Sequence, residues 1–238
     1  MYYNCKNGCF RCNVGAQGWT DCLGQPKPNT RRTIYGSATG TTTGLTLNGD
    51  VATVTAPGGS GFTAGGVLNP RLTDQATSAA AGSDAGMQGS FQISLILAPL
   101  LQTEFGPSTT ANIRMWTGLT NQTIANMDSA NAAGHYAAFC YDTSAGDANW
   151  KCITKDGTTQ NIQDSGVAPS GSGGVQKFEV SYSNTPSVTF KINGNVVCTS
   201  TANLPGVVQL YAWNNSVHAL AASAITGRTG YVYLETSF

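Results

Sequence analysis

Alternation of apolar and polar side chains is clearest between residues 175 and 200. Large apolar residues occupy every second position of 178–182 and of 188–192, with serine, threonine, glutamate or lysine between them. Asn193-Gly194 follows directly, and this pair favours a two-residue type I′ turn, which needs positive φ at both central positions. The pattern predicts an antiparallel meander with one buried face, which must pack against another layer.

The rest of the chain shows short runs of the same kind, separated by Gly, Thr, Asn and Pro, with almost no helical periodicity. Residues 91–97 form a dense apolar run that predicts a central strand. Residues 73–89 favour a weak helix or a surface loop, and 120–131 one helical turn. The remaining strands are predicted at 33–35, 44–47, 51–55, 113–119, 135–141, 149–154, 158–163, 207–213 and 231–234. So many short strands predict an all-β, two-sheet antiparallel jelly-roll sandwich.

The apolar phase of these strands predicts the residues that fill the space between the sheets. Burial of one such side chain stabilises a fold by about 1.5–3 kcal/mol. The predicted members are Ile93, Leu95, Leu97, Trp116, Phe139, Phe178, Val180, Phe190, Ile192 and Leu210.

The first 32 residues differ from the body. They hold four of the seven cysteines and end in an extended Pro-Lys-Pro linker, so the chain divides into a small Cys-rich N-terminal anchor (1–32) and a jelly-roll sandwich (33–238). Cys5, Cys9, Cys12 and Cys22 have a spacing that would suit one tetrahedral zinc ion. Two disulfides would staple so small a segment equally well, and free thiols are the third option.

Cys140 and Cys152 flank the loop of the 139–153 hairpin. If Tyr141 and Trp150 pair near its mouth, the two cysteines lie nearly opposite, within reach of a disulfide. Both would also serve as small buried apolar residues, a role that suits Cys198 better still. Because seven is odd, at least one thiol stays unpaired within a monomer.

Charge is scarce and unevenly distributed. Only 10% of residues are charged and the whole chain is neutral. The first 32 residues carry five basic side chains against Asp21, a net charge of +4, so the remainder carries −4. The segment is therefore expected either to dock on an acidic surface or to be a solvated arm. The docking residues would be Lys6, Arg11, Lys27, Arg31 and Arg32.

Composition also bears on location. A surface of hydroxyls and amides is common in secreted β proteins and virion proteins, yet the N-terminus has no leader pattern and no apolar run is long enough to span a membrane. A virus particle assembled in a host cytoplasm reconciles these observations.

Several motifs resemble those of a known family. They are Met115–Thr120, Tyr141-Asp142-Thr143, Gly146-Asp147 with Asn149–Cys152, and Val188–Gly194. Over residues 90–236 the chain resembles the concanavalin A-like jelly-roll domains of bacteriophage capsid-decoration, tail and fibre proteins. The resemblance implies a non-enzymatic protein of the particle surface.

No catalytic constellation stands out. The carboxylates are few, and the two histidines, His135 and His218, lack a partner at a telling spacing. Sugar binding is the main rival to a purely structural role, because such lectins stack sugars on aromatics and hold hydroxyls with Asn and Asp. The candidates are Trp150 with Asp147 and Asn149, and Trp213 with Asn214, although a strand tryptophan is more often part of the core.

The sequence thus predicts a capsid decoration or cement protein on the virion surface, bound to the major capsid or another virion protein. A glycan-binding tail or fibre protein is the alternative, and a polysaccharide-degrading enzyme a distant third. Apart from zinc, no cofactor is indicated. The low-charge surface favours a homo-oligomer such as a trimer, and neither membrane nor nucleic acid is an expected partner.

Overall fold

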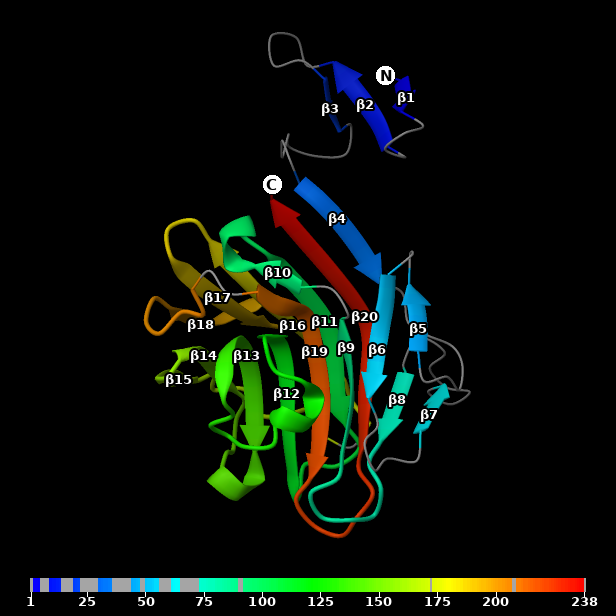
Figure 1. The fold of residues 1–238 in the computed structure, drawn as a ribbon, viewed down its shortest axis with the longest axis vertical. Coiled ribbons are helices and arrows are strands. Elements are labelled where there is room, and N and C mark those ends of the chain that lie inside the picture. The colour runs from blue at the N-terminus through cyan, green and yellow to red at the C-terminus, as the bar shows by residue number, and fades with distance from the viewer. Residues whose placement is uncertain are drawn as a thin grey trace. The chain divides into compact units, whose positions relative to one another are not determined.

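The structure is a computed structural model, and Figure 1 shows its ribbon. It describes residues 2–4, 9–13, 19–21, 30–35, 44–47, 50–55, 61–64, 73–89, 92–171, 173–206 and 209–237. Before residue 74, and at 209, 211, 212 and 237, this description covers the backbone alone. In this part of the chain, no helix has the length and apolar character needed to cross a bilayer.

Contacts along the backbone group the chain into two compact units. The first comprises residues 1–31 with 237–238, and its described strands form an antiparallel sheet in the order β1 (Tyr2–Asn4), β2 (Cys9–Asn13), β3 (Trp19–Asp21). The second unit, residues 32–236, holds two antiparallel sheets. It has the predicted architecture, a two-sheet jelly-roll sandwich.

We call the two sheets of the second unit the large and the small sheet. Among the described residues, the large sheet runs in the order β15 (Gln160–Asp164), β14 (Lys151–Gly157), β13 (Gly134–Asp142), β12 (Ile113–Thr120), β19 (Gln209–Ala219), β9 (Asp84–Gly89), β6 (Asp50–Thr55) and β5 (Gly44–Leu47), and β10 (Gln92–Ser94) also pairs with β19. The small sheet runs in the order β18 (Asn195–Ser200), β17 (Ser187–Ile192), β16 (Gln176–Ser183), β11 (Leu100–Pro107), β20 (Thr226–Ser237), β8 (Thr73–Ala76) and β7 (Gly61–Ala64), and β4 (Thr30–Tyr35) also pairs with β20. Figure 1 shows these strands in place. Among the described residues, short 3-10 helices are formed by η2 (Leu95–Leu97), η3 (Ile124–Asn126) and η4 (Thr143–Ala145).

The meander predicted from the alternation is confirmed as β16, β17 and β18. Val180 pairs with Phe190, and Phe190 with Cys198. Asn193 and Gly194 have φ values of 53° and 85°, the left-handed conformation that a type I′ turn requires. The alternation therefore located both the strands and the turn between them.

Most of the predicted core residues lie in the cluster between the sheets. The ring of Phe139 from the large sheet lies 4.9 Å from that of Phe178 and 5.2 Å from that of Phe190, both in the small sheet. The other predicted members in this cluster are Ile93, Leu95, Val180, Ile192 and Leu210.

Two core predictions are wrong. Trp116 is fully buried, but it belongs to a second cluster on the opposite face of the large sheet, with Tyr136, Cys140 and Ile153. Leu97 is half-buried in η2. The predicted strand 91–97 is interrupted there, because β10 ends at Ser94 and Ala98 takes a left-handed conformation.

The region 73–89 is also not the predicted helix or loop. It forms β8 and β9, joined by residues 77–83. β9 reads Asp-Ala-Gly-Met-Gln-Gly, and Ala85 and Met87 alone supply its apolar phase. Long-range pairing with β19 on one side and β6 on the other stabilises a strand that local pattern does not indicate.

The disulfide of the body joins Cys152 on β14 to Cys198 on β18, so the predicted Cys140–Cys152 bond is wrong. The hairpin register pairs Phe139 with Cys152 and Cys140 with Lys151. Cys140 therefore faces away from Cys152, because an offset of one residue moves a side chain to the other face of a sheet. Cys140 is buried and free.

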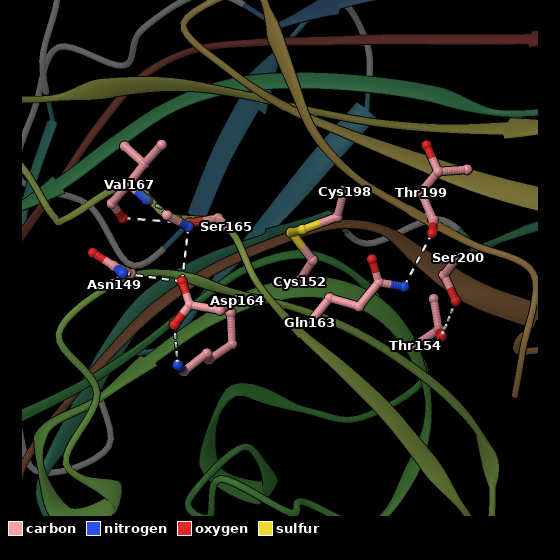
Figure 2. The surroundings of a disulfide bond; sticks show 12 residues. Asn149, Cys152, Thr154, Gln163, Asp164, Ser165, Val167, Cys198, Thr199 and Ser200 are labelled. Carbon is pink, nitrogen blue, oxygen red and sulfur yellow. Dashed lines mark hydrogen bonds and ion pairs between the residues drawn. A yellow bond between two sulfur atoms is a disulfide. The ribbon is translucent and has the colours of Figure 1, made fainter.

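Around this disulfide the edges of the two sheets are linked, as Figure 2 shows. Gln163 on β15 donates to the carbonyl of Thr199 (3.0 Å), and the hydroxyls of Thr154 and Ser200 lie 2.9 Å apart. The covalent bond and these hydrogen bonds close the end of the sandwich at which β14 and β15 meet β18.

Cys198→Ala is expected to lower the free energy of unfolding by about 2–4 kcal/mol, since the bond closes a loop of 46 residues in the unfolded chain. Urea unfolding with and without reductant measures this, and the variant should match the reduced wild type. A peptide map under non-reducing conditions should contain the Cys152–Cys198 pair. A Cys140–Cys152 peptide, or equal stabilities of oxidised and reduced protein, would contradict the assignment.

Candidate functional site

The face of the large sheet turned away from the small sheet, here called the outer face, carries the most unusual chemistry in the described residues. Along β19, Trp213 and Val217 enter the core between the sheets. Asn214, Ser216 and His218 alternate with them and so lie on the outer face. All three are buried, with exposed fractions of 1%, 0% and 3%.

Cross-strand register surrounds these three residues with polar or small neighbours. Ser216 pairs with Trp116 and Gly86, Asn214 with Gly118 and Gln88, and His218 with Arg114 and Asp84. At Gly86 a Cβ atom would lie only 2.9 Å from Ser216 Cα, so glycine is needed for this close approach.

Several polar atoms here have no hydrogen-bond partner among the described residues. They are Asn214 Oδ1 and Nδ2, Ser216 Oγ, His218 Nε2 and Trp116 Nε1. We call these four residues the outer-face cluster. A buried polar group without a partner costs about 1–3 kcal/mol, so a run of them on one surface requires a bound molecule or ordered water.

Asn215, on the opposite face of the same strand, provides the contrast. Its Oδ1 accepts from Thr117 Oγ1 (2.7 Å), and its Nδ2 donates to Thr103 Oγ1 (2.9 Å) on the small sheet. Both polar atoms of the Asn215 amide are thus satisfied, and the amide links the two sheets. The polar atoms of Asn214 are not, which sets the outer-face cluster apart from the core.

One end of the site holds a buried ion pair. Arg114 Nε donates to Asp142 Oδ2 at 2.6 Å, and Asp142 is fully buried. Burial alone would raise the pKa of Asp142, but hydrogen bonds from Ser144 and Arg114 outweigh it and lower that pKa. Asp142 is therefore ionised and neutralises the Arg114 guanidinium.

His218 lies next to this pair and is neutral at physiological pH. Burial, reinforced by the nearby Arg114 guanidinium, lowers its pKa from 6.5 to about 3. On the other side, burial and the charge of Asp128 raise the pKa of Asp84. The outer-face cluster thus contains no uncompensated positive charge.

The shifted pKa of His218 has a consequence for stability. Its imidazole accepts a proton in the unfolded chain below pH 6.5 but in the folded chain only near pH 3. Stability is therefore lost as pH falls between these values, by up to about 1.4 kcal/mol per pH unit from this residue. Urea unfolding of wild type and His218→Gln at pH 7, 5.5 and 4 tests this. The variant should lack this part of the slope, and parallel curves would contradict it.

The prediction that two tryptophans stack on a sugar is wrong. Trp150 and Trp213 are both fully buried in the core between the sheets. Trp150 also donates its Nε1–H to Gln176 Oε1 at 2.9 Å. Neither indole presents a face to a sugar, because each occupies the apolar phase of its strand or loop.

The polar residues predicted to bind a glycan differ in whether they are already hydrogen-bonded. Asp147 accepts from the backbone of Asp142 (3.0 Å), and Asn149 donates to Asp164 (3.0 Å), so both organise the loop after β13. Asn214 alone stays available, since it belongs to the outer-face cluster.

The other predicted site residues lie outside the described side chains. These are Cys5, Cys9, Cys12 and Cys22 of the zinc or disulfide prediction, and Lys6, Arg11, Lys27, Arg31 and Arg32 of the docking prediction. Where side chains are described, no three His, Cys, Asp or Glu residues converge as metal ligands.

Sequence reasoning missed Trp116, Ser216 and His218 as site residues. The available signal was the spacing Asn214-x-Ser216-x-His218 in a strand whose other phase is largely apolar. Such a pattern is typical of a solvent-exposed face, and only the fold shows that this face is covered.

No protein-family model matches the sequence, and no curated protein does. Solved structures match the fold. A protein of unknown function from Shewanella oneidensis MR-1 aligns with a TM-score of 0.60 at 9% identity, over 88% of this chain and 87% of that one. The Crh5 transglycosylase in complex with NAG gives 0.52 at 12% identity, over 86% and 87%.

A legume lectin-like domain from Entamoeba histolytica gives a TM-score of 0.51 at 11% identity, over 77% of this chain and 88% of that one. At such identities the shared property is the fold. The chain has a concanavalin A-like jelly-roll fold. The jelly-roll and lectin-like fold prediction is therefore confirmed, while the link to bacteriophage proteins stays a prediction.

Proposed function

We propose that this protein is a non-enzymatic carbohydrate-binding protein of a bacteriophage particle surface. The observation that carries the proposal is the outer-face cluster, where an amide, a hydroxyl, an imidazole and an indole N–H lie side by side without partners. Sugar hydroxyls both donate and accept, and they match such a set. The fold supports the proposal, since a lectin-like domain and a transglycosylase bound to NAG have similar structures.

The spacing of carboxylates favours binding over hydrolysis. Asp84 and Asp142 lie at the two ends of one cross-strand row, with His218 and Arg114 between them. Three strand spacings separate their Cα atoms by about 14 Å. Glycosidases hold their two carboxyl groups about 5–9.5 Å apart, so these two side chains would have to lean toward each other across His218 and Arg114 to form such a pair. Asp142 is moreover committed to Arg114.

A glycan array probed with the full-length chain tests the proposal. Binding to at least one glycan is the expected result, and no binding at any protein concentration would contradict the carbohydrate role. The glycan that binds is then incubated with the protein, and no new reducing ends are expected. Hydrolysis that is lost in Asp84→Asn or Asp128→Asn would contradict the non-enzymatic part.

Attachment to the particle is assigned to residues 1–32, as in a capsid decoration protein. The supporting observation is the excess of five basic residues over one acidic residue in this segment. A full-length variant with Lys6, Arg11, Lys27, Arg31 and Arg32 changed to Gln should no longer co-sediment with particles. Wild-type binding should weaken with salt. Undiminished binding of the variant would place the contact on the sandwich instead.

Self-association remains the proposed state, with a trimer as the expected size. Light scattering of the full chain tests it, and a monomer at high concentration would count against it.

A further inference from the structure

Residues 121–133, here called the cover segment, extend over the outer face of the large sheet. Its η3 turn contacts both β9 and β19. Ile124, Met127 and Ala132 are buried, and the last two pack in the cluster that contains Trp116 and Tyr136. The segment therefore lies over the same strands that carry the outer-face cluster.

Side chains of the sheet hold the cover segment in place. Gln88 donates to the carbonyl of Gln122 (2.7 Å), and Arg114 to that of Asp128. At the other end, Lys155 Nζ donates to Asn131 Oδ1 (2.8 Å) and to the carbonyl of Ala132 (2.7 Å). Such contacts can be exchanged without opening the sheet, because they are separate from the backbone hydrogen bonds between strands.

The groups beneath are suited to an uncharged ligand. The guanidinium of Arg114 is neutralised by Asp142 at 2.6 Å. The other buried cation of the outer face in the described residues, Lys155 on β14, already donates to Asn131 and to the carbonyl of Ala132. An acidic sugar would bring a carboxylate for which β9, β12 and β19 hold no free cation, which is costly in a buried site. Hydroxyl groups would pair with the free atoms of Asn214, Ser216 and Trp116.

We infer that the outer-face cluster is a covered binding site for an uncharged saccharide, which enters when the cover segment is displaced. The inference rests on the proposed carbohydrate function and adds its location, its ligand class and the need for a local opening. Ordered water is the competing occupant, and the experiment below separates the two.

The test uses the indole N–H signals of the uniformly 15N-labelled full chain, which has four tryptophans. Neutral disaccharides (chitobiose, cellobiose, lactose) and an acidic one (digalacturonate) are titrated in turn, together with any glycan that binds on the array. A neutral saccharide should shift the Trp116 signal, assigned with Trp116→Phe. The Trp150 signal should not move, because that indole is bonded to Gln176.

Matched variants complete the design. Asn214→Ala should weaken binding by about tenfold or more, and Asn149→Ala, on the loop after β13, by less than about twofold. Ser216→Ala should also weaken binding while its melting temperature stays at or above that of wild type, since a buried hydroxyl without a partner costs stability. This variant separates loss of binding from loss of fold.

Each of the remaining outcomes would refute a specific part of the inference. A Trp116 shift with digalacturonate alone refutes the ligand class. A glycan that binds on the array but leaves Trp116 and the Asn214→Ala affinity unchanged refutes the site, while the proposed function stands. If no saccharide binds in either assay, both the proposed carbohydrate function and the inferred site are refuted, and the outer-face cluster is occupied by water only.

Discussion

Arg114→Met is expected to lower the free energy of unfolding by about 3–5 kcal/mol, because it leaves the fully buried carboxylate of Asp142 without its cation. The substitution also removes the bonds from Arg114 to Asp128 of the cover segment and to Ser144. Urea unfolding at pH 7 measures the loss.

Arg228→Met is the matched control. Arg228 pairs with Asp74 at 3.2 Å, but its side chain is 30% exposed, so its removal should cost less than about 1 kcal/mol. The double variant Arg114→Met, Asp142→Asn should recover part of the loss, since no buried charge is then left unpaired. Equal effects of the two single variants would show that the Arg114 pair is not the buried contact described.

Phe190→Ala is expected to cost about 3–5 kcal/mol through the cavity it leaves between the sheets. The ring is fully buried and lies edge-on to Phe139 at 5.2 Å, so it joins the small sheet to the large one. Thermal or urea unfolding gives the value.

Val196→Ala is the control for this prediction. Val196 lies on the neighbouring strand with 61% of its surface exposed, and its truncation should change stability by no more than about 0.5 kcal/mol. A loss below about 1 kcal/mol for Phe190→Ala would mean that the inter-sheet packing at β17 is not as described.

Local pattern predicted the meander and the hairpin well, because one face of β16–β18 is dry and the other is wet. It failed on β12, where Met115 and Trp116 are both fully buried, on opposite faces. Period-two alternation cannot show which of two buried faces lies between the sheets. The cover segment, which lies over the second face, comes from a loop that the strand pattern does not mark.

The disulfide shows a related limit. Cys140 and Cys152 belong to one hairpin, but a register shift of one residue places them on opposite faces. Cys198 is 46 residues from its partner and on the other sheet, a pairing that only the packing of the two sheets reveals.

The outer-face cluster could not be predicted from the sequence for the same reason. The pattern places Asn214, Ser216 and His218 on the solvent-exposed side of a strand, and nothing in their spacing indicates that they are buried. Of the five predicted glycan residues, Asn214 is the one that the fold leaves unpartnered, while Trp150 and Trp213 fill the core.

A crystal structure of the full chain with a neutral oligosaccharide from the array would locate the sugar. We expect sugar hydroxyls within hydrogen-bond distance of Asn214, Ser216 and Trp116, with the cover segment displaced from its position in the unliganded protein. A saccharide bound elsewhere, with ordered water alone on those three side chains, would contradict this expectation.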